Sequence, residues 1–324
     1  MTTGFSGKVG FIGLGNVGAK LAGSLLRNKL DLTLRDLDRS AAASLLEQGA
    51  AWADSPAEMA AQCDIVITCL PSPAISAAVM ESDDGILAGL RPGSIWAEMS
   101  TTDEAEVKRL GSLVEAAGSA AVDCPVSGGC HRAATGNISI FAGCQREVFD
   151  RMLPLLTVMG RRILHTGPLG SASVLKVMTN YLATANLVTL SEALVTMQLA
   201  GLDLATTYEA IRISSGNSFV HETESQVILN GSRDINFTMD LVLKDIGLFQ
   251  ALAEKHRAPL EVSPLLVQMF GDAIDRYGPR EFSPNIIRRF EEATGASVLA
   301  DGFPAEIIDD EPEERGAEVI PKHG

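Results

Sequence analysis

The sequence predicts an α/β protein in which a doubly wound parallel sheet is followed by an all-helical C-terminal domain. In the first half of the chain, short apolar segments of strand length alternate with helical segments. This order is typical of parallel strands that are joined by helices. After Gly170 the strand signals mostly vanish and long helical patterns replace them. We therefore expect a domain boundary between residues 165 and 170.

The elements of the first domain follow from apolar runs and their period. Short continuous apolar runs indicate buried strands, and apolar residues at helical spacing indicate the helices between them. Pro71 and Pro73 would end one of the strands. We expect strands at Lys8–Ile12, Leu32–Arg35, Asp64–Leu70, Ser94–Ala97 and Ala120–Asp123, a further strand at an edge of the sheet at Asn137–Ala142, and helices at Val17–Arg27 and Arg39–Gln48.

The second half of the chain predicts helices alone. Ser171–Ala200 has the length of one long helix, which would form the spine of the second domain. A new helix is expected at Asp203, where Asp203 or Thr206 could cap it. Further helices are expected at Phe237–His256 and Glu261–Asp275. The predicted domains are residues 1–168, residues 169–296, and an acidic tail over residues 297–324.

Composition narrows the class of protein. The net charge is −15, which argues against nucleic acid or an anionic membrane as the main partner. None of the five cysteines forms a CxxC pair or a zinc pattern, so we expect reduced thiols, a cytoplasmic location and no metal. We expect no signal sequence before Lys8. Polar residues interrupt the apolar stretch Val174–Leu199, which favours a buried helix over a membrane span.

The tail from Asp301 onward differs from the rest of the chain. It combines three prolines with a high density of acidic residues. Such a composition is typical of a disordered extension. The alternative is an arm that packs on a partner subunit. The acidic residues are Glu306, Asp309, Asp310, Glu311, Glu313, Glu314 and Glu318.

A GxGxxG pattern at Gly13, Gly15 and Gly18 lies between the first strand and the first helix, which is the context of a Rossmann-type dinucleotide site. Gly13 permits a tight turn, Gly15 lets the backbone approach a pyrophosphate, and Gly18 lets the helix pack on the strand. The start of the helix offers free N–H groups to the phosphates. The intervening residues Leu14, Asn16 and Val17 belong to the same predicted site.

Asp36 ends the second strand, close to the distance of about 20 residues after the glycines at which an acidic residue binds the adenosine ribose. Its carboxylate would accept hydrogen bonds from the ribose hydroxyls and repel a 2′-phosphate, and Asp38 would add to that repulsion. The pattern therefore favours NAD over NADP. Arg35 and Arg39 keep NADP as the alternative, because arginine can hold a 2′-phosphate.

Two further segments carry chemistry. Ser127, Gly128 and Gly129 follow a strand and offer a hydroxyl and unobstructed N–H groups, which could form a nest for a carboxylate. Lys176 and Asn180 are four residues apart in the long predicted helix, so their side chains share one face.

With Cys69-Leu70-Pro71-Ser72, Ser100-Thr101 and Phe237–Asp245, these segments give the chain a resemblance to the β-hydroxyacid dehydrogenase family, the group that includes 3-hydroxyisobutyrate dehydrogenase. The resemblance spans about residues 8 to 295. It implies roles for individual positions. These are cofactor contacts at Leu70, Pro71, Thr101 and Lys244, substrate contacts at Ser127, Gly128, Gly129, Phe219, Phe237 and Asp245, and catalysis by Lys176 and Asn180.

The chain departs from the family pattern at three places. Glu98 replaces a usual aspartate, Thr179 replaces the first of two asparagines, and His131-Arg132 replaces small residues. We hypothesise that Arg132 binds a second acidic group on a larger substrate. The alternative is a solvated side chain.

The resemblance implies an oxidoreductase that transfers a hydride between NAD and the 3-hydroxyl of a small 3-hydroxy acid. Lys176 would be the general acid and base, and we expect burial to lower the pKa of its amine. Candidate substrates include 3-hydroxyisobutyrate, tartronate semialdehyde, L-serine and threonate. The alternatives are an imine reductase-like enzyme, a phosphogluconate-type decarboxylating dehydrogenase and a non-catalytic NAD-binding module. A homodimer or homotetramer is expected from the family.

Overall fold

The computed structural model describes residues 5–322 and divides the chain into two compact units. The first unit comprises Met1–Lys176 together with Asp309–Gly324, and the second comprises Val177–Ile308. The helix α9 (Ser171–Leu199) begins in the first unit and continues into the second.

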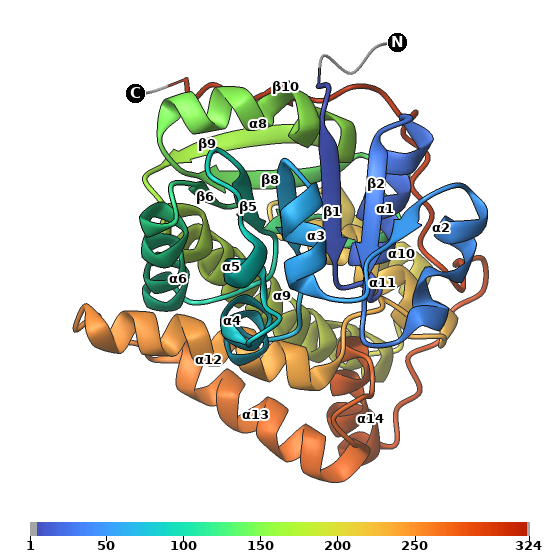
Figure 1. The fold of residues 1–324 in the computed structure, drawn as a ribbon. Helices are drawn as coiled ribbons and strands as arrows, with labels where there is room; N and C mark the ends of the chain where they lie inside the picture. The colour runs from blue at the N-terminus through green and yellow to red at the C-terminus, as the bar shows by residue number, and fades with distance from the viewer. Residues whose placement is uncertain (1–4, 323–324) are drawn as a thin grey trace. The chain divides into compact units, whose positions relative to one another are not determined.

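The first unit is built on a ten-stranded sheet with the order β10-β9-β8-β6-β5-β4-β1-β2-β3, in which β7 pairs with β8 off the main path (Figure 1). The neighbouring strands from β6 to β3 are all parallel, whereas β8 runs antiparallel to β6. The parallel, doubly wound sheet is therefore confirmed. The strands are β1 (Lys8–Ile12), β2 (Asp31–Arg35), β3 (Ala51–Trp52), β4 (Ile65–Thr68), β5 (Ile95–Glu98), β6 (Ala120–Asp123), β7 (Val126–Ser127), β8 (Ile138–Gly143), β9 (Gly160–Gly167) and β10 (Ala317–Glu318).

Both faces of the parallel strands are buried, as continuous apolar runs require. In β4, Ile65 and Ile67 pack into one apolar cluster, while Val66 packs into another on the opposite face. The helices that cover these faces begin with side-chain caps where the chain supplies Ser or Asp, as at Ser55, which accepts from the Glu58 N–H at 3.1 Å. The helices are α1 (Gly18–Arg27), α2 (Ala43–Glu47), α3 (Pro56–Gln62), α4 (Pro73–Glu81), α5 (Ile86–Gly89), α6 (Glu104–Ala116), α7 (Gly129–Thr135) and α8 (Arg146–Met159).

Two local predictions need correction. The helix expected over Arg39–Gln48 is divided into a 3₁₀ turn, Arg39–Ala42, and the short helix α2. The strand expected at Asn137–Ala142 exists as β8, but the prediction that it lies at the edge is wrong, because β9 and β10 extend the sheet beyond it. The strand β9 lacks a clear strand pattern in the sequence, because Arg161, Arg162 and His165 interrupt its apolar residues.

The second unit consists of helices with one isolated β-bridge, which confirms the predicted all-helical domain. Asp203 caps α10 by accepting from the Thr206 N–H at 2.7 Å. Its apolar core is a separate cluster that includes Leu194, Phe270 and Ile286. After α9, its helices are α10 (Leu204–Arg212), α11 (Phe219–Asn230), α12 (Met239–Lys255), α13 (Val262–Tyr277), the 3₁₀ helix Ser283–Ile287 and α14 (Arg288–Thr294).

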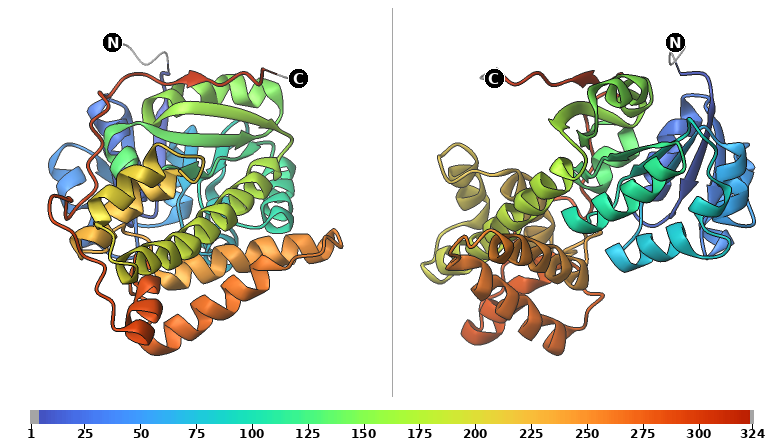
Figure 2. Two further views of the ribbon diagram at one scale, coloured as in Figure 1. Left: turned by 180° about the vertical axis from the view of Figure 1, so that it is seen from behind. Right: turned by 60° about the vertical axis from the view of Figure 1, so that its left-hand side comes forward.

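The acidic tail has regular contacts within its own chain over part of its length. Residues 309–318 lie along the first unit of the same chain, where β10 adds to the edge of the sheet beside β9 (Figures 1 and 2). The carboxylates of this tail find polar partners on the first unit, and Asp309 accepts from Thr135 and from the buried Asn137. Four of the acidic side chains find arginines on the first unit, at Glu311, Glu313, Glu314 and Glu318.

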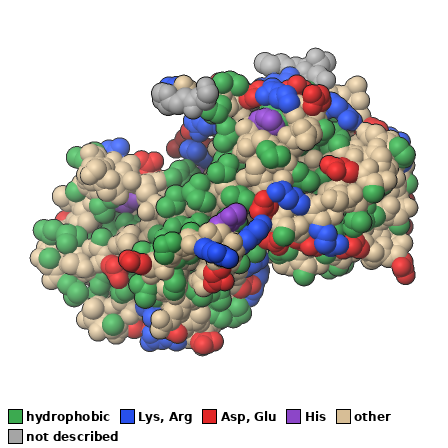
Figure 3. Space-filling view, turned by 90° about the vertical axis from the view of Figure 1, so that its left-hand side faces the viewer, with side chains coloured by type: hydrophobic (Ala, Val, Ile, Leu, Met, Phe, Trp, Pro, Cys, Tyr) green, Lys and Arg blue, Asp and Glu red, His purple; other side chains and the backbone are tan. Residues whose placement is uncertain are grey.

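None of the described helices is both long and apolar enough to cross a membrane. On the face drawn in Figure 3, acidic and basic side chains of the described residues are interspersed, and no extended basic surface is visible there.

The half-buried carboxyl of Glu224 in the second unit should make the stability of the protein depend on pH. Burial raises the pKa of Glu224 from its ordinary 4.5 to about 8, while the Ser283 hydroxyl at 3.5 Å acts in the opposite direction. The folded protein therefore holds a proton that the unfolded chain releases, and the free energy of unfolding falls as pH rises from 4.5 to about 8.

We expect Glu224→Gln to abolish this fall in the free energy of unfolding with rising pH. At pH 8 the free energy of unfolding of the variant should exceed that of the wild type by about 2 kcal/mol. This is less than the whole pKa shift of Glu224 would give, because solvent screens the charge of a half-buried side chain. At pH 5 the two proteins should differ little. Urea unfolding at both pH values measures the difference, and a difference that does not change with pH would contradict the prediction.

Candidate active site

The turn after β1 has the geometry that each of its three glycines was expected to provide. Gly13 has φ of 97°, and a Cβ at this position would lie 2.3 Å from the carbonyl oxygen of Cys69. A Cβ at Gly18 would lie 2.0 Å from the carbonyl oxygen of Gly13. At Gly15 no atom lies within 4 Å of that position. The turn therefore leaves open space at Gly15, which fits the close approach of a pyrophosphate.

Asp36 lies beside this turn at the end of β2. Its Oδ2 accepts from the Leu14 N–H at 2.6 Å, and its Oδ1 accepts from the Asp38 N–H at 3.0 Å. Arg35 lies at the same place, because its guanidinium donates to the Asp36 carbonyl. The guanidinium groups of Arg35 and Arg39 lie over the Trp52 ring, 5.4 and 5.2 Å from its centroid. The Asp36 carboxylate is thus bonded to the glycine turn, and the Arg35 guanidinium lies next to it.

The predicted cofactor and substrate segments of the first unit meet at one edge of the sheet. They follow the carboxyl ends of five parallel strands that are neighbours in the sheet. The strand order changes direction between β1 and β4, and a crevice at such a point is where ligands bind in doubly wound sheets. The residues at this edge are Gly13 after β1, Asp36 after β2, Leu70 and Pro71 after β4, Thr101 after β5 and Ser127 after β6.

Glu98, to which the sequence assigns no role, joins two of these segments. The Leu70 N–H donates to the Ser100 hydroxyl at 2.7 Å, and that hydroxyl donates in turn to the Glu98 carboxylate. The Ser100 N–H also donates to Glu98, at 2.9 Å. Burial raises the pKa of Glu98, and the bonds from Ser100 act against this. Glu98 therefore holds the turns after β4 and β5 together. The only sequence signal is its departure from the family's aspartate.

The loop Ser127–Gly129 needs its glycines for conformational reasons. Gly128 and Gly129 have φ of 128° and 85°, which L side chains rarely adopt. Gly129 is also the first residue of α7. The two unusual residues that follow lie close to this turn. Arg132 Cδ and His131 Cε1 lie 3.4 and 2.7 Å from where a Cβ would be on Gly128 and Gly129 respectively.

Asp123 connects this loop with the start of α9. The side chain is fully buried, and burial raises the pKa of its carboxyl. Its Oδ1 accepts from the Gly170 N–H at 2.7 Å, and its Oδ2 accepts from the N–H and the hydroxyl of Ser173 at 2.7 and 2.9 Å. Lys176 lies almost one turn further along the same helix and is only 8% exposed.

Three of the predicted site residues in the second unit form one network. Asp245 is 2% exposed and accepts from the Asn180 amide and from the Lys244 ammonium, the latter at 2.5 Å. The two predicted phenylalanines have different environments. Phe237 packs against the core of the unit, whereas Phe219 is 42% exposed at the first residue of α11.

The thiols are not poised for nucleophilic or metal chemistry. None of the five cysteines forms a disulfide, and burial raises the pKa of Cys63 to about 11 and that of Cys69 and Cys144 to about 12. A thiol with such a pKa stays protonated at neutral pH. Within residues 5–322, no group of three or more His, Cys, Asp or Glu side chains is arranged to hold a metal ion.

Comparison with known families and curated proteins identifies two consecutive matches. Residues 8–167 match the model of the NAD binding domain of 6-phosphogluconate dehydrogenase. Residues 170–289 match the model described as the NAD-binding domain of NADP-dependent 3-hydroxyisobutyrate dehydrogenase. The chain is 32% identical to 2-(hydroxymethyl)glutarate dehydrogenase of Eubacterium barkeri over 90% of this chain and 97% of that protein. It is also 32% identical to the NAD-dependent L-serine dehydrogenase of Pseudomonas aeruginosa over 85% of this chain and 95% of that protein.

Solved structures give the same result. The crystal structure of 3-hydroxyisobutyrate dehydrogenase from Salmonella typhimurium matches with a TM-score of 0.81 and 28% identity, covering 88% of this chain and all of that one. An imine reductase from Myxococcus stipitatus matches with a TM-score of 0.60 and 17% identity over 88% of this chain and 99% of its own, which shows a shared fold alone. The chain therefore belongs to the β-hydroxyacid dehydrogenase family, whose members are NAD(P)-dependent oxidoreductases acting on CH–OH groups.

Proposed function

We propose that the protein interconverts the 3-hydroxyl of a small 3-hydroxy acid and the corresponding aldehyde or ketone, with NAD as cofactor and Lys176 as the general acid and base. The observation that carries this proposal is the position of Lys176. It is a buried lysine on a helix whose first turn is tied, through Asp123, to the loop that would hold the substrate carboxylate.

The cofactor would lie on the glycine turn and beside Asp36. The open space at Gly15 and the carboxylate held at the end of β2 support this placement. The nicotinamide supplies a hydride acceptor in oxidation and a hydride donor in reduction. The turns that contain Leu70, Pro71 and Thr101 would orient its nicotinamide half, and Lys244 would contact it from the second unit.

The substrate carboxylate would bind to Ser127, Gly128 and Gly129. The positive φ of both glycines leaves their N–H groups unobstructed by side chains, which suits an anion. Lys176 would accept the proton of the substrate hydroxyl during oxidation and return a proton to the carbonyl oxygen during reduction. The amine of Lys176 would thus accept the proton in one direction and donate it in the other.

Asn180 would orient the substrate or the lysine amine. Its Nδ2 donates to Asp245, which fixes the orientation of the amide and leaves the carbonyl oxygen as the end suited to accept a bond from a hydroxyl or an ammonium. The second unit would also contribute Phe219 and Phe237 as walls of the substrate pocket, and a surface for assembly into a homodimer or homotetramer. The absence of disulfides among the five cysteines favours a cytoplasmic setting.

The first experiment measures turnover of a panel of hydroxy acids by the change in absorbance of the reduced cofactor. The panel comprises L-serine, 3-hydroxyisobutyrate, 2-(hydroxymethyl)glutarate and threonate, together with tartronate semialdehyde as a substrate for reduction. Turnover of at least one member would support the proposal. A protein that binds NAD but turns over none of them would refute it and favour a non-catalytic NAD-binding role.

Lys176→Ala tests the assigned acid and base. We expect kcat to fall by about 1,000-fold, in the range lost with a general acid–base group, while NAD binds as in the wild type. Lys108→Ala is the matched control, because Lys108 is an exposed lysine paired with Glu104 on α6. A kcat near that of the wild type in the Lys176 variant would remove the assignment.

Asp36→Ser tests the cofactor preference. Removal of the carboxylate should lower the ratio of kcat/KM for NAD to that for NADP by about 30-fold, because the ribose contact and the repulsion of a 2′-phosphate are both lost. The ratio is the measurement, since loss of the bond from the Leu14 N–H would weaken both cofactors alike. Asp31→Asn, at the opposite end of β2, is the control. An unchanged ratio in Asp36→Ser would contradict the assignment.

A further inference from the structure

The acidic segment Asp309–Glu318, called here the C-terminal strap, is attached to the first unit along its whole length. It lies outside both family matches, which end at residue 289. At its far end, β10 pairs in parallel with β9, and the Val319 N–H donates to the Ile163 carbonyl at 2.7 Å. Glu314 and Glu318 pair there with Arg161 and Arg146.

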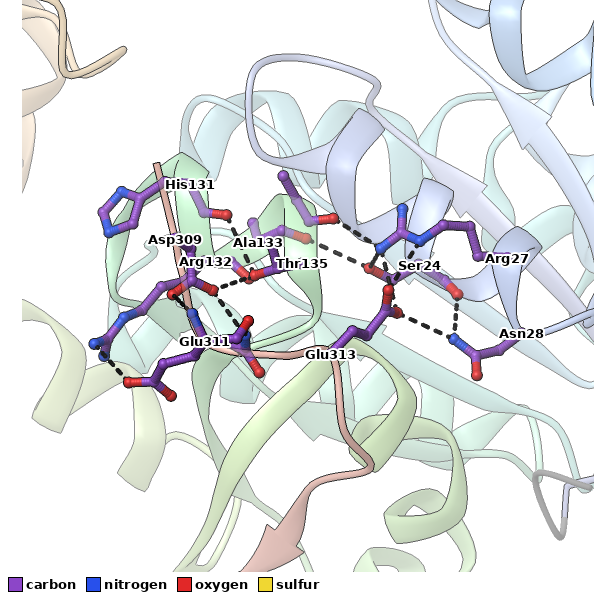
Figure 4. A network of polar contacts seen from close by, with 12 residues as sticks. Ser24, Arg27, Asn28, His131, Arg132, Ala133, Thr135, Asp309, Glu311 and Glu313 are labelled. Atoms are coloured by element: carbon purple, nitrogen blue, oxygen red, sulfur yellow. Dashed lines mark hydrogen bonds and ion pairs between the residues drawn. The ribbon is translucent and has the colours of Figure 1, made fainter. Parts of the chain in front are cut away.

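The near end of the strap binds a different element, the short helix α7 and the residues that follow it (Figure 4). The Asp309 carboxylate accepts from the Thr135 hydroxyl and from the Asn137 amide, the latter at 2.7 Å. The same Asn137 amide donates to the Glu311 carbonyl at 2.9 Å. The Glu311 side chain pairs with Arg132 at 3.4 Å.

The contacts of the strap contribute differently to its stability because their side chains are buried to different extents. The pair between Arg27 and Glu313 has both side chains 39% exposed, and such pairs contribute little. Asn137, in contrast, is 1% exposed, so its amide needs an acceptor inside the protein. Burial alone raises the pKa of Asp309, but the bonds from Thr135 and Asn137 outweigh it and lower the pKa overall. Asp309 is therefore the principal anchor of the strap on α7.

The helix α7 depends on such outside support. It has only seven residues, too few to be stable by its own hydrogen bonds. On one side, Arg27 of α1 donates to the Ala134 carbonyl at 2.7 Å. At its C-terminal end, Asp309 accepts from Thr135 and from Asn137, just beyond the helix. The first residue of α7 is Gly129 and its N-cap is Gly128, so the position of the helix sets the position of the predicted carboxylate loop.

We propose that Asp309, acting through α7, is a positioning residue for the substrate-carboxylate loop Ser127–Gly129. This inference rests on the proposed function of that loop. A substrate whose carboxylate binds there would meet a loop that the strap holds in place in advance, so loss of the strap contact weakens substrate binding without altering the reacting groups. The pairing of Arg132 with Glu311 belongs to the same device, and it directs the Arg132 charge to the strap.

The test compares Asp309→Ala with the matched control Glu318→Gln. Glu318 belongs to the same strap, but it pairs with Arg146 of α8 rather than with α7. For Asp309→Ala we expect the KM of the hydroxy acid to rise about ten-fold, while kcat and the Kd of NAD stay within about two-fold of the wild type. Loss of binding that is equal in the ground and transition states has this signature. Hydrogen exchange of the amides of residues 129–137 should also become faster.

The control should leave both the KM and the exchange of α7 unchanged. Asp309→Asn, which keeps one acceptor oxygen, should give a KM between those of Asp309→Ala and the wild type. Thr135→Val removes the hydroxyl donor from the side of α7, so it provides a second test if Asp309→Ala does not fold, and it should raise the KM in the same direction.

The outcomes distinguish a failure of the proposed function from a failure of the positioning role of Asp309. A wild-type protein that turns over no hydroxy acid refutes the proposed function and the positioning role with it. An active wild type whose KM and α7 exchange are the same in Asp309→Ala refutes the positioning role alone. An equal rise of KM in Glu318→Gln also overturns the role, because it would show a general effect of loosening the strap rather than an effect through α7.

Discussion

The structure of the candidate site depends on the buried carboxylate of Asp123. A buried carboxylate is costly unless hydrogen bonds replace its hydration. Asp123 receives three such bonds, all from Gly170 and Ser173 at the start of α9, where the free N–H groups of a helix favour a negative charge. Because Asp123 ends β6, this one interaction relates the carboxylate loop that follows the strand to the helix that presents Lys176.

The same device recurs around the site. Asp36 accepts from the backbone of the glycine turn, Glu98 from the Ser100 backbone and hydroxyl, and Asp309 from Thr135 and Asn137 beyond the loop that it supports. Asp36 and Asp309 hold polar groups of a distant segment directly, whereas Glu98 does so through Ser100, whose hydroxyl accepts from the Leu70 N–H. The negative charge of these carboxylates is thus compensated by bonds within the protein, so an acidic chain would still accommodate the anionic substrate and cofactor that we propose.

The glycine turn and the positions of the strands β1, β2, β4, β5 and β6 could be predicted from the sequence because they depend on local properties. Positive φ at Gly13 and close packing at Gly18 are requirements of the chain itself. The strand β9 and the packing of the strap could not be predicted. Charged residues interrupt the apolar pattern of β9, so the sequence does not indicate a strand there. The acidic composition of the strap indicates disorder, because the sequence does not show that four arginines lie beside it. These are Arg27, Arg132, Arg146 and Arg161.

The sequence by itself determined the fold class, the family and the residue types of the site, because period, glycine spacing and ordered motifs are all written along the chain. Only the tertiary structure decided which side chains bind one another. Asn180 and Asp245, or Thr135 and Asp309, are far apart in the sequence, and no local pattern encodes their hydrogen bonds. The physical reason is that a buried polar group needs a hydrogen-bond partner, and the groups that lie within reach are set by the packing of the whole chain rather than by neighbours in the sequence.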